Sequence, residues 1–152
     1  MEQLDTWYHG TPRWQQILDD GVDIDAPKHS DPGDFGWGVY LTKRLTRARS
    51  YGKVFEVIID TTNLALIPNP YFLAGLQTVI PNTPEEKLFY SLAFGSSGDM
   101  LTTTGTAAER IAASRKIQTA FLAAGYQGIL SNYDGGEAVL FHASPIRSLI
   151  LL

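Results

Sequence analysis

Residues 34–51, DFGWGVYLTKRLTRARSY, form the stretch around which the rest of the chain is arranged. A glycine-containing loop leads into an apolar strand over 38–42, and a basic helix follows over 43–52. Tyr40 lies in this strand and Tyr51 lies at the end of this helix. A strand followed by a helix can bring two such rings to opposite walls of one slot, which suits a flat cationic ring because aromatic faces are electron-rich. The alternative is that both tyrosines are packing residues.

The flanking segments predict two more strands and a helix between the first strand and the central stretch. Residues 4–9 and 53–60 are rich in the β-branched and aromatic residues that favour strands. Thr11 followed by Pro12 predicts a helix start, with threonine as N-cap and proline at the first helical position. This helix carries Trp14, Ile17 and Leu18 on one apolar face and ends at Gly21, before a polar loop over 22–34.

The second half of the chain predicts two capped helices and a group of strands. Thr83 and Thr106 are each followed three residues later by a glutamate, so both predict capping boxes, for helices over 83–94 and 106–124. Residues 61–82 and 95–105 read as irregular, apart from a short strand near 64–67. The end of the chain predicts strands over 126–133, 137–142 and 146–152, the first two joined by a tight hairpin at Asp134-Gly135.

The strands are clustered and do not alternate strictly with helices, so the pattern predicts an α+β fold. The length of 152 residues fits one domain, spanning residues 1–152. The net charge of −4 argues against a general nucleic-acid binder. There is no cysteine, no signal-peptide pattern at the start and no apolar run of membrane-spanning length. We therefore expect a cytoplasmic protein with no membrane partner.

Several common catalytic and cofactor-binding motifs are missing from the sequence. Gly36-Trp37-Gly38 lacks the third glycine of a dinucleotide fingerprint and leads into a strand, and neither a phosphate-binding loop nor a nucleophile elbow occurs. The histidines His9, His29 and His142 do not have the spacing of metal ligands. We expect no metal.

Three short pieces place polar residues at the edges of apolar strands: Tyr8-His9-Gly10-Thr11, the strand over 38–42, and the strand opened by Glu137 after two glycines. Taken singly, each has a plain structural interpretation. His9 would be a satisfied strand histidine, Tyr40 a core residue and Glu137 a solvated strand end.

Taken together and in this order, the three pieces resemble the H-Y-E class of ADP-ribosyltransferases, the branch of diphtheria toxin and poly-ADP-ribose polymerase. The match runs from Tyr8 to the end of the chain and is most similar to small bacterial and phage-associated members. YHGT matches the first family motif, DFGWGVYLT with Tyr51 the second, and GYQGILSNYDGGEAVLFHASPIRSL the third. The sequence departs from the family at Ala48, where the polymerase branch often has serine, and residues 61–110 match nothing in it.

The resemblance implies a split β-sandwich of two small sheets flanked by helices, with NAD⁺ bound as co-substrate in the cleft between them. It implies that His9 contacts the adenosine ribose, that the Gly10 backbone holds the nicotinamide carboxamide, and that Tyr40 and Tyr51 sandwich the nicotinamide ring. Glu137 would be the catalytic residue, acting on the nicotinamide ribose as positive charge develops. The cofactor-binding residues implied are His9, Gly10, Thr11, Tyr40 and Tyr51.

The function so implied is NAD-dependent mono-ADP-ribosylation of a macromolecule, protein or nucleic acid, by a bacterial or phage toxin or effector. An antitoxin or immunity protein would then be a further partner. Other interpretations stay open: ADP-ribosylation of a small molecule such as a rifamycin, for which relatives use aspartate in place of Glu137, or a non-catalytic NAD or ADP-ribose binding module. A tRNA 2′-phosphotransferase would want arginines where Tyr40 and Glu137 stand.

Overall fold

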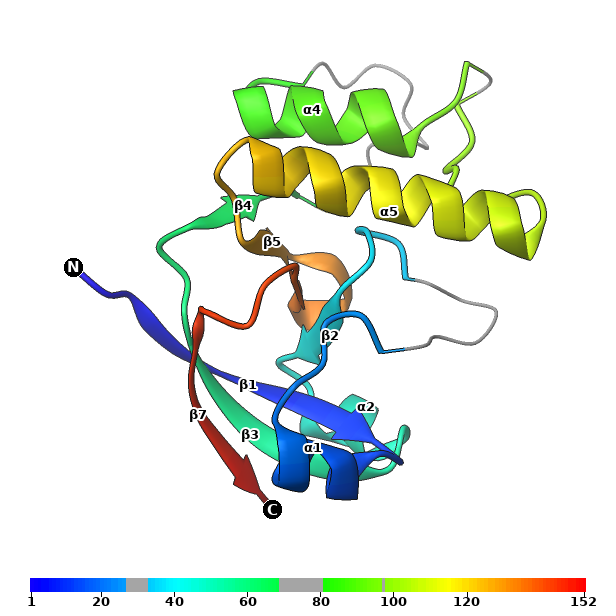
Figure 1. The fold of residues 1–152 in the computed structure, drawn as a ribbon. Coiled ribbons are helices and arrows are strands. Elements are labelled where there is room, and N and C mark those ends of the chain that lie inside the picture. The colour runs from blue at the N-terminus through cyan, green and yellow to red at the C-terminus, as the bar shows by residue number, and fades with distance from the viewer. Residues whose placement is uncertain (27–32, 69–80, 97) are drawn as a thin grey trace.

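The computed structural model describes residues 1–26, 33–68, 81–96 and 98–152 (Figure 1). The described helices are α1 (Trp14–Asp20), α2 (Leu45–Arg49), α4 (Pro84–Ala93) and α5 (Ala107–Ala123), with a short 3₁₀ helix, η1 (Tyr133–Gly135). The strands are β1 (Leu4–Thr11), β2 (Val39–Thr42), β3 (Lys53–Asp60), β4 (Leu64–Leu66), β5 (Gly128–Ser131), β6 (Glu137–Leu140) and β7 (Ile146–Leu151).

These strands form one curled, mixed sheet in the order β4-β5-β6-β2-β1-β3-β7 (Figure 1). β4 runs parallel to β5, and the remaining neighbours are antiparallel. The fold is therefore α+β, with helices on the faces of a single sheet. The split β-sandwich of two small sheets that the resemblance implied is wrong.

A short junction between β1 and β2 joins into one sheet the strands that the resemblance had divided between two sheets. The strands are in register at a single pair, Tyr8 and Thr42. Next to this pair, the Lys43 ammonium donates to the Thr6 carbonyl oxygen at 2.6 Å and pairs with the Asp5 carboxylate, also at 2.6 Å. The junction joins a half made of β4, β5, β6 and β2 to a half made of β1, β3 and β7. Pairing between strands so far apart in the chain leaves no local sequence signal.

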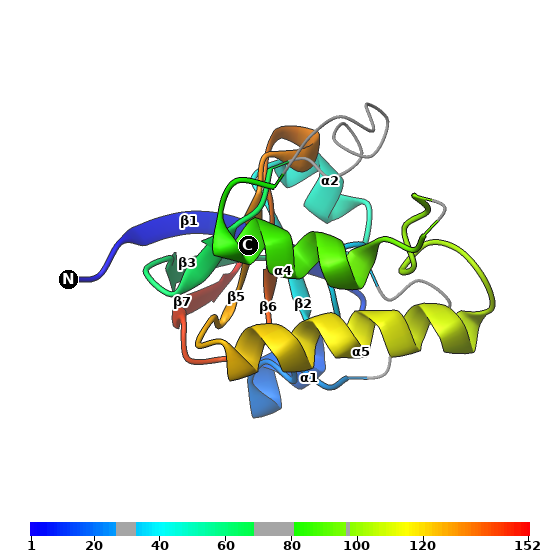
Figure 2. The same cartoon turned by 90° about the horizontal axis from the view of Figure 1, so that it is seen from above.

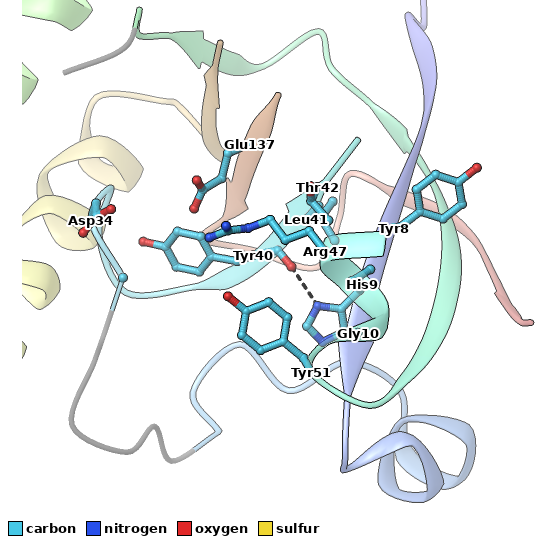
Figure 3. Close-up of a pocket in the computed structure, with 12 residues that line it drawn as sticks. Tyr8, His9, Gly10, Asp34, Tyr40, Leu41, Thr42, Arg47, Tyr51 and Glu137 are labelled. Atoms are coloured by element: carbon cyan, nitrogen blue, oxygen red, sulfur yellow. Dashed lines mark hydrogen bonds between the residues drawn. The ribbon is translucent and has the colours of Figure 1, made fainter. Parts of the chain in front are cut away.

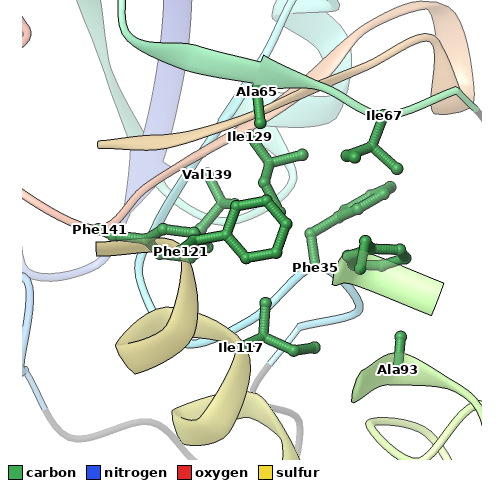
Figure 4. Packing of buried hydrophobic residues seen from close by; sticks show 10 residues of the cluster. Phe35, Ala65, Ile67, Ala93, Ile117, Phe121, Ile129, Val139 and Phe141 are labelled. Atoms are coloured by element: carbon green, nitrogen blue, oxygen red, sulfur yellow. The ribbon is translucent and has the colours of Figure 1, made fainter. Parts of the chain in front are cut away.

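Side chains of the strands alternate between two core clusters, as the period of a β-strand requires. In β6, Val139 faces one cluster, whereas Ala138 and Leu140 face the other. The first cluster lies under α4 and α5, which run side by side over the sheet (Figures 1, 2 and 4). It contains Phe35, Ala65, Ile67, Phe89, Ala93, Ile117, Phe121, Ile129, Val139 and Phe141. The second contains Trp7, Val39, Leu41, Phe55, Val57, Ile59, Leu64, Ala138 and Leu140.

The predicted starts of α4 and α5 are confirmed. Thr106 and Glu109 form the full capping box, each side chain accepting from the other residue's backbone N–H. Thr83 accepts from the backbone N–H of Glu86 at 3.2 Å, as predicted. The Glu86 carboxylate, however, accepts from the backbone N–H of Asn82, so the reciprocal half of that box is displaced by one residue.

The helix predicted from Thr11 begins later, at Trp14, with Arg13 as N-cap. Thr11 stays in β1, where it pairs with Lys53, because the ladder with β3 continues to the end of both strands. Trp14 and Ile17 pack against the second cluster as expected, and Gly21 is the C-cap. Leu18, expected on the same apolar face, is 51% exposed.

The helix predicted over 43–52 is shorter, with α2 covering Leu45–Arg49 and a turn completing it. The predicted C-terminal hairpin exists, since β5 and β6 pair antiparallel up to Ser131 and Glu137. Its connection is not the tight Asp-Gly turn predicted but a five-residue loop over 132–136 that includes η1.

Other predictions concern the strand ends and loops. The short strand expected near 64–67 is confirmed as β4, and the strands expected over 53–60 and 146–152 correspond to β3 and β7. The parts of the predicted loops at 27–32, 69–80 and 97 lie outside the described residues, and so does His29. No helix in the described part of the chain has the length and apolar character needed to cross a membrane.

Candidate functional site

A cavity of about 310 Å³ opens where β1 and β2 diverge beyond their single paired position (Figure 3). Its walls come from β1, the loop before β2, β2 itself, α2, the turn after α2, and the start of β6. The volume lies at the lower end of the range of about 300–1,000 Å³ typical of small-molecule sites. The lining residues are Tyr8, His9, Gly10, Gly33, Asp34, Tyr40, Leu41, Thr42, Arg47, Ala48, Tyr51 and Glu137.

His9 bridges the gap between the diverging strands. Its Nδ1 lies 2.7 Å from the backbone carbonyl oxygen of Tyr40, as the dashed line in Figure 3 marks. A carbonyl oxygen only accepts, so Nδ1 carries the proton of this bond, and Nε2 is an acceptor when the ring is neutral. His9 thus links β1 to β2 at the wall of the cavity, with the proton of its neutral ring on Nδ1.

Gly10 is the point at which α2 packs directly on β1. A Cβ added to Gly10 would lie 1.7 Å from the carbonyl oxygen of Ala48. Only glycine permits this approach. The contact sets the position of α2 and therefore of Tyr51, which follows it. The requirement for glycine thus comes from helix packing, whatever contact its backbone makes with a ligand.

Thr11 does not line the cavity, although it was expected among the cofactor-binding residues. Its side chain is buried, and its Oγ1 accepts from the backbone N–H of Arg13 at 2.9 Å. This bond turns the chain from β1 into α1, so the threonine has a structural explanation at this position.

The two tyrosines line the same cavity but differ in how they are held. The Tyr40 hydroxyl donates to the Gly36 carbonyl oxygen at 2.6 Å and accepts from the Phe35 backbone N–H at 3.0 Å. Gly33 lies against the same end of the ring, where a Cβ would be 2.3 Å from the Tyr40 Cζ. Tyr51 is 56% exposed. The Tyr40 wall of the cavity is therefore fixed by contacts with the backbone, whereas the Tyr51 wall is exposed to solvent.

Glu137 opens β6 and points into the cavity (Figure 3). It is in register with Thr42 on one side and Ser131 on the other. The residue before it, Gly136, has φ of 130° and accepts from the Lys43 backbone N–H at 3.2 Å. The carboxylate is therefore mounted on a strand end whose backbone is tied to the neighbouring strand.

Asp134 connects the loop before Glu137 to α2. Its carboxylate pairs with Arg44 at 2.5 Å and with Arg47 at 2.9 Å. Asp134 adopts a φ of 52°, a left-handed conformation that is uncommon outside glycine and that aspartate tolerates better than most residues. The basic helix predicted over 43–52 contributes Arg44 and Arg47 to these ion pairs. In the structure, two of its arginines hold this loop.

Arg47 and Asp34 line the cavity, and the sequence did not single them out as site residues. A signal for Arg47 was available, because it lies one helical turn before Tyr51 and such residues share a helix face. No comparable signal marks Asp34. Burial raises the pKa of Tyr133, the nearby carboxylates of Asp34 and Glu137 raise it further, and Arg47 lowers it.

A flat cation of the chain itself, the Arg47 guanidinium, lies in the cavity near Glu137. Burial by itself would lower the pKa of Arg47, but Tyr51, Asp134, Glu137 and Tyr133 together raise it. Figure 3 shows the guanidinium group reaching into the space bounded by Tyr40, Tyr51 and Glu137.

Among residues 1–26, 33–68, 81–96 and 98–152, no group of three acidic or histidine side chains is arranged to hold a metal.

Comparisons with known proteins contradict the assignment by resemblance. No family model matches the chain, and no curated protein matches it. A solved structure described as "Crystal structure of an anti-CRISPR protein" is similar over 99% of this chain and 96% of that one, with 11% identity and a TM-score of 0.42. The membership in the H-Y-E class of ADP-ribosyltransferases that three short motifs suggested is therefore wrong.

Proposed function

We propose that the protein uses NAD⁺ to transfer ADP-ribose to a macromolecular acceptor, with release of nicotinamide. The observation that carries this proposal is the convergence of His9, Tyr40, Tyr51 and Glu137 on one cavity from four separate segments. Each supplies a different group: an imidazole, a fixed aromatic wall, an exposed aromatic wall and a carboxylate.

The donor set fits the nicotinamide end of NAD⁺. The ring there is flat and cationic, and aromatic faces attract such a group. Arg47 already presents a flat cation to the same space, beside Tyr51 and Glu137. The guanidinium group thus acts as a stand-in that supports the fit. Nε2 of His9 would accept a hydrogen bond from a ribose hydroxyl, since Nδ1 already donates to the Tyr40 carbonyl oxygen.

Glu137 would act on the bond between nicotinamide and the ribose. When that bond breaks, its electron pair leaves with nicotinamide, which departs neutral, and positive charge develops on the sugar. A carboxylate beside the sugar stabilises that charge more strongly than it stabilises the ground state. The acceptor forms the new bond to the same sugar carbon, and its proton passes to a carboxylate of the cavity, Glu137 or Asp34.

The test measures NAD⁺ binding by calorimetry, nicotinamide release by chromatography, and transfer of labelled ADP-ribose to a cell lysate. Glu137→Gln keeps the size and a hydrogen-bond acceptor but removes the charge. We expect kcat to fall by about 10²–10³ with little change in affinity for NAD⁺. Glu56→Gln is the matched control, because Glu56 lies on β3 of the same sheet and does not line the cavity.

The lysate, treated separately with protease and nuclease, identifies the class of acceptor. If neither protease nor nuclease changes the labelled product and that product is small, the acceptor is a small molecule. Binding of NAD⁺ without nicotinamide release would mean a non-catalytic binding module. Absence of both binding and release would remove the proposed function, as would normal turnover in a folded Glu137→Gln variant.

A further inference from the structure

The position of Arg47 raises a conflict inside the proposed site. Its guanidinium group shares the cavity with Tyr40, Tyr51 and Glu137, where the proposed function puts a cationic ring (Figure 3). Two cations in one small cavity repel each other, more strongly as water is excluded. The two groups are therefore mutually exclusive in this space, and Arg47 must turn away when the ring enters.

Asp134 keeps one of its two arginine partners when Arg47 turns away, because Arg44 binds Oδ1 and Arg47 binds Oδ2. Asp134 is held by two arginines, Arg44 at 2.5 Å and Arg47 at 2.9 Å. If Arg47 turns away, the Asp134 carboxylate keeps Arg44 as a partner, and the loop before Glu137 remains tied to α2. The side chain of Arg47 is itself 38% exposed, so it is not enclosed by packing. If Arg47 were the only partner of Asp134, its departure would leave the Asp134 carboxylate without a positive charge beside it.

We propose that Arg47 is a ligand-exchange residue, which occupies the cation position of the cavity while paired with Asp134 and moves to the diphosphate when a dinucleotide binds. This rests on the proposed function. The chemistry matches, because guanidinium groups bind phosphate oxygens through two parallel hydrogen bonds. The exchange makes the site select ligands that carry both groups, since a cationic ring alone must displace Arg47 without offering it a new partner.

Calorimetry with two fragments of the ligand separates the two halves of this role. ADP-ribose carries the diphosphate without nicotinamide, and nicotinamide riboside carries the cationic ring without phosphate. In Arg47→Ala we expect the Kd for ADP-ribose to rise about tenfold, for one lost charged contact. We expect the Kd for nicotinamide riboside to fall about two- to fivefold, because a competing cation is gone.

Two further variants make the result specific. Arg49→Ala removes the same charge from the same helix at an exposed position that does not line the cavity, and should change neither affinity. Arg47→Lys keeps the charge without the flat fork. It should recover only part of the affinity for ADP-ribose, leaving the Kd between those of wild type and Arg47→Ala, without improving nicotinamide riboside binding. Thermal unfolding of each variant checks that the fold is intact.

The opposite shifts of the two fragments are the expected result. Equal weakening of both fragments in Arg47→Ala would mean that the residue only shapes the cavity, and unchanged binding of both would mean that it plays no part. Either result overturns the proposal for Arg47 while NAD⁺ binding by the wild type still stands. A wild-type protein that binds neither fragment nor NAD⁺ overturns the proposed function, and the role of Arg47 with it.

Discussion

At the scale of single residues, Tyr40 combines a cavity wall with an anchor for the chain before it. Its hydroxyl bonds to the backbone of Phe35 and Gly36, and both of these residues are buried. The sequence suggested an aromatic ring, for which phenylalanine would serve as well. The structure adds a reason for the hydroxyl that has nothing to do with a ligand.

Removing that hydroxyl should therefore cost stability. Tyr40→Phe leaves a buried N–H and a buried C=O without this partner, and we expect the free energy of unfolding to fall by about 1–3 kcal/mol. Tyr51→Phe, at a 56% exposed position, should stay within about 0.5 kcal/mol of wild type. Urea unfolding of the three proteins measures both values. Equal stabilities for the two variants would show that the bonds to Phe35 and Gly36 contribute nothing.

Gly10 offers a second residue-scale prediction. The Cβ of Gly10→Ala would meet the Ala48 carbonyl oxygen at 1.7 Å, so α2 must move away from β1. We expect a loss of about 1–3 kcal/mol in the free energy of unfolding, the usual cost of overpacking. Gly95→Ala is the control, because its Cβ would first meet the flexible end of Leu101 at 3.2 Å. The idea fails if both alanine variants unfold at the same urea concentration.

At the scale of elements, the helices over the first core cluster are specified by their first turns. The capping box of α5 satisfies two backbone N–H groups that a helix start otherwise leaves without partners. These contacts span three residues, so they could be read from the sequence. The end of α2 could not, because its position depends on the contact between Ala48 and Gly10.

The cap of α5 can be tested on its own. Thr106→Ala should lower the free energy of unfolding by about 0.5–2 kcal/mol through loss of the N-cap. Ser91→Ala is a suitable comparison, because Ser91 lies inside α4 and its hydroxyl bonds only to the preceding turn of the same helix at Leu88. That change should be close to neutral. An equally small effect for Thr106→Ala would show that packing alone sets the start of α5.

At the scale of the whole molecule, Asp60 links the N-terminal segment, β3 and the region before β7. Hydrogen bonds from the Thr62 side chain and from the backbone N–H groups of Gln3 and Thr62, with Arg147 nearby, lower the pKa of Asp60 from 3.8 to about 2. The folded state therefore binds this proton less tightly than the unfolded state does. The resulting stability is present above about pH 4 and is lost as the pH falls toward 2.

Asp60→Asn should remove this part of the pH dependence. We expect the difference in free energy of unfolding between wild type and variant to shrink as the pH is lowered from about 4 to about 2, and to be constant between pH 5 and 7. Urea unfolding at a series of pH values measures it. If the difference stayed constant down to pH 2, the negative charge of Asp60 would contribute nothing to the stability of the fold.

The sequence by itself determined the features that depend on neighbours within a few residues. These are the helix caps at Thr83 and Thr106, the apolar run of strands such as β6, and the polar residues at or near strand ends, among them Glu137 and His9. Propensity, capping and strand period act over short stretches of chain, so they remain legible in a one-dimensional pattern.

Only the tertiary structure decided how these pieces meet. The cavity depends on the contact of His9 with Tyr40, 31 residues away, and on the pair of Arg44 with Asp134, 90 residues away. The same holds for the β1–β2 junction, which turned two expected sheets into one, and for the entry of Arg47 and Asp34 into the site. Contacts between distant segments are fixed by the packing of the whole chain, and no local pattern encodes them.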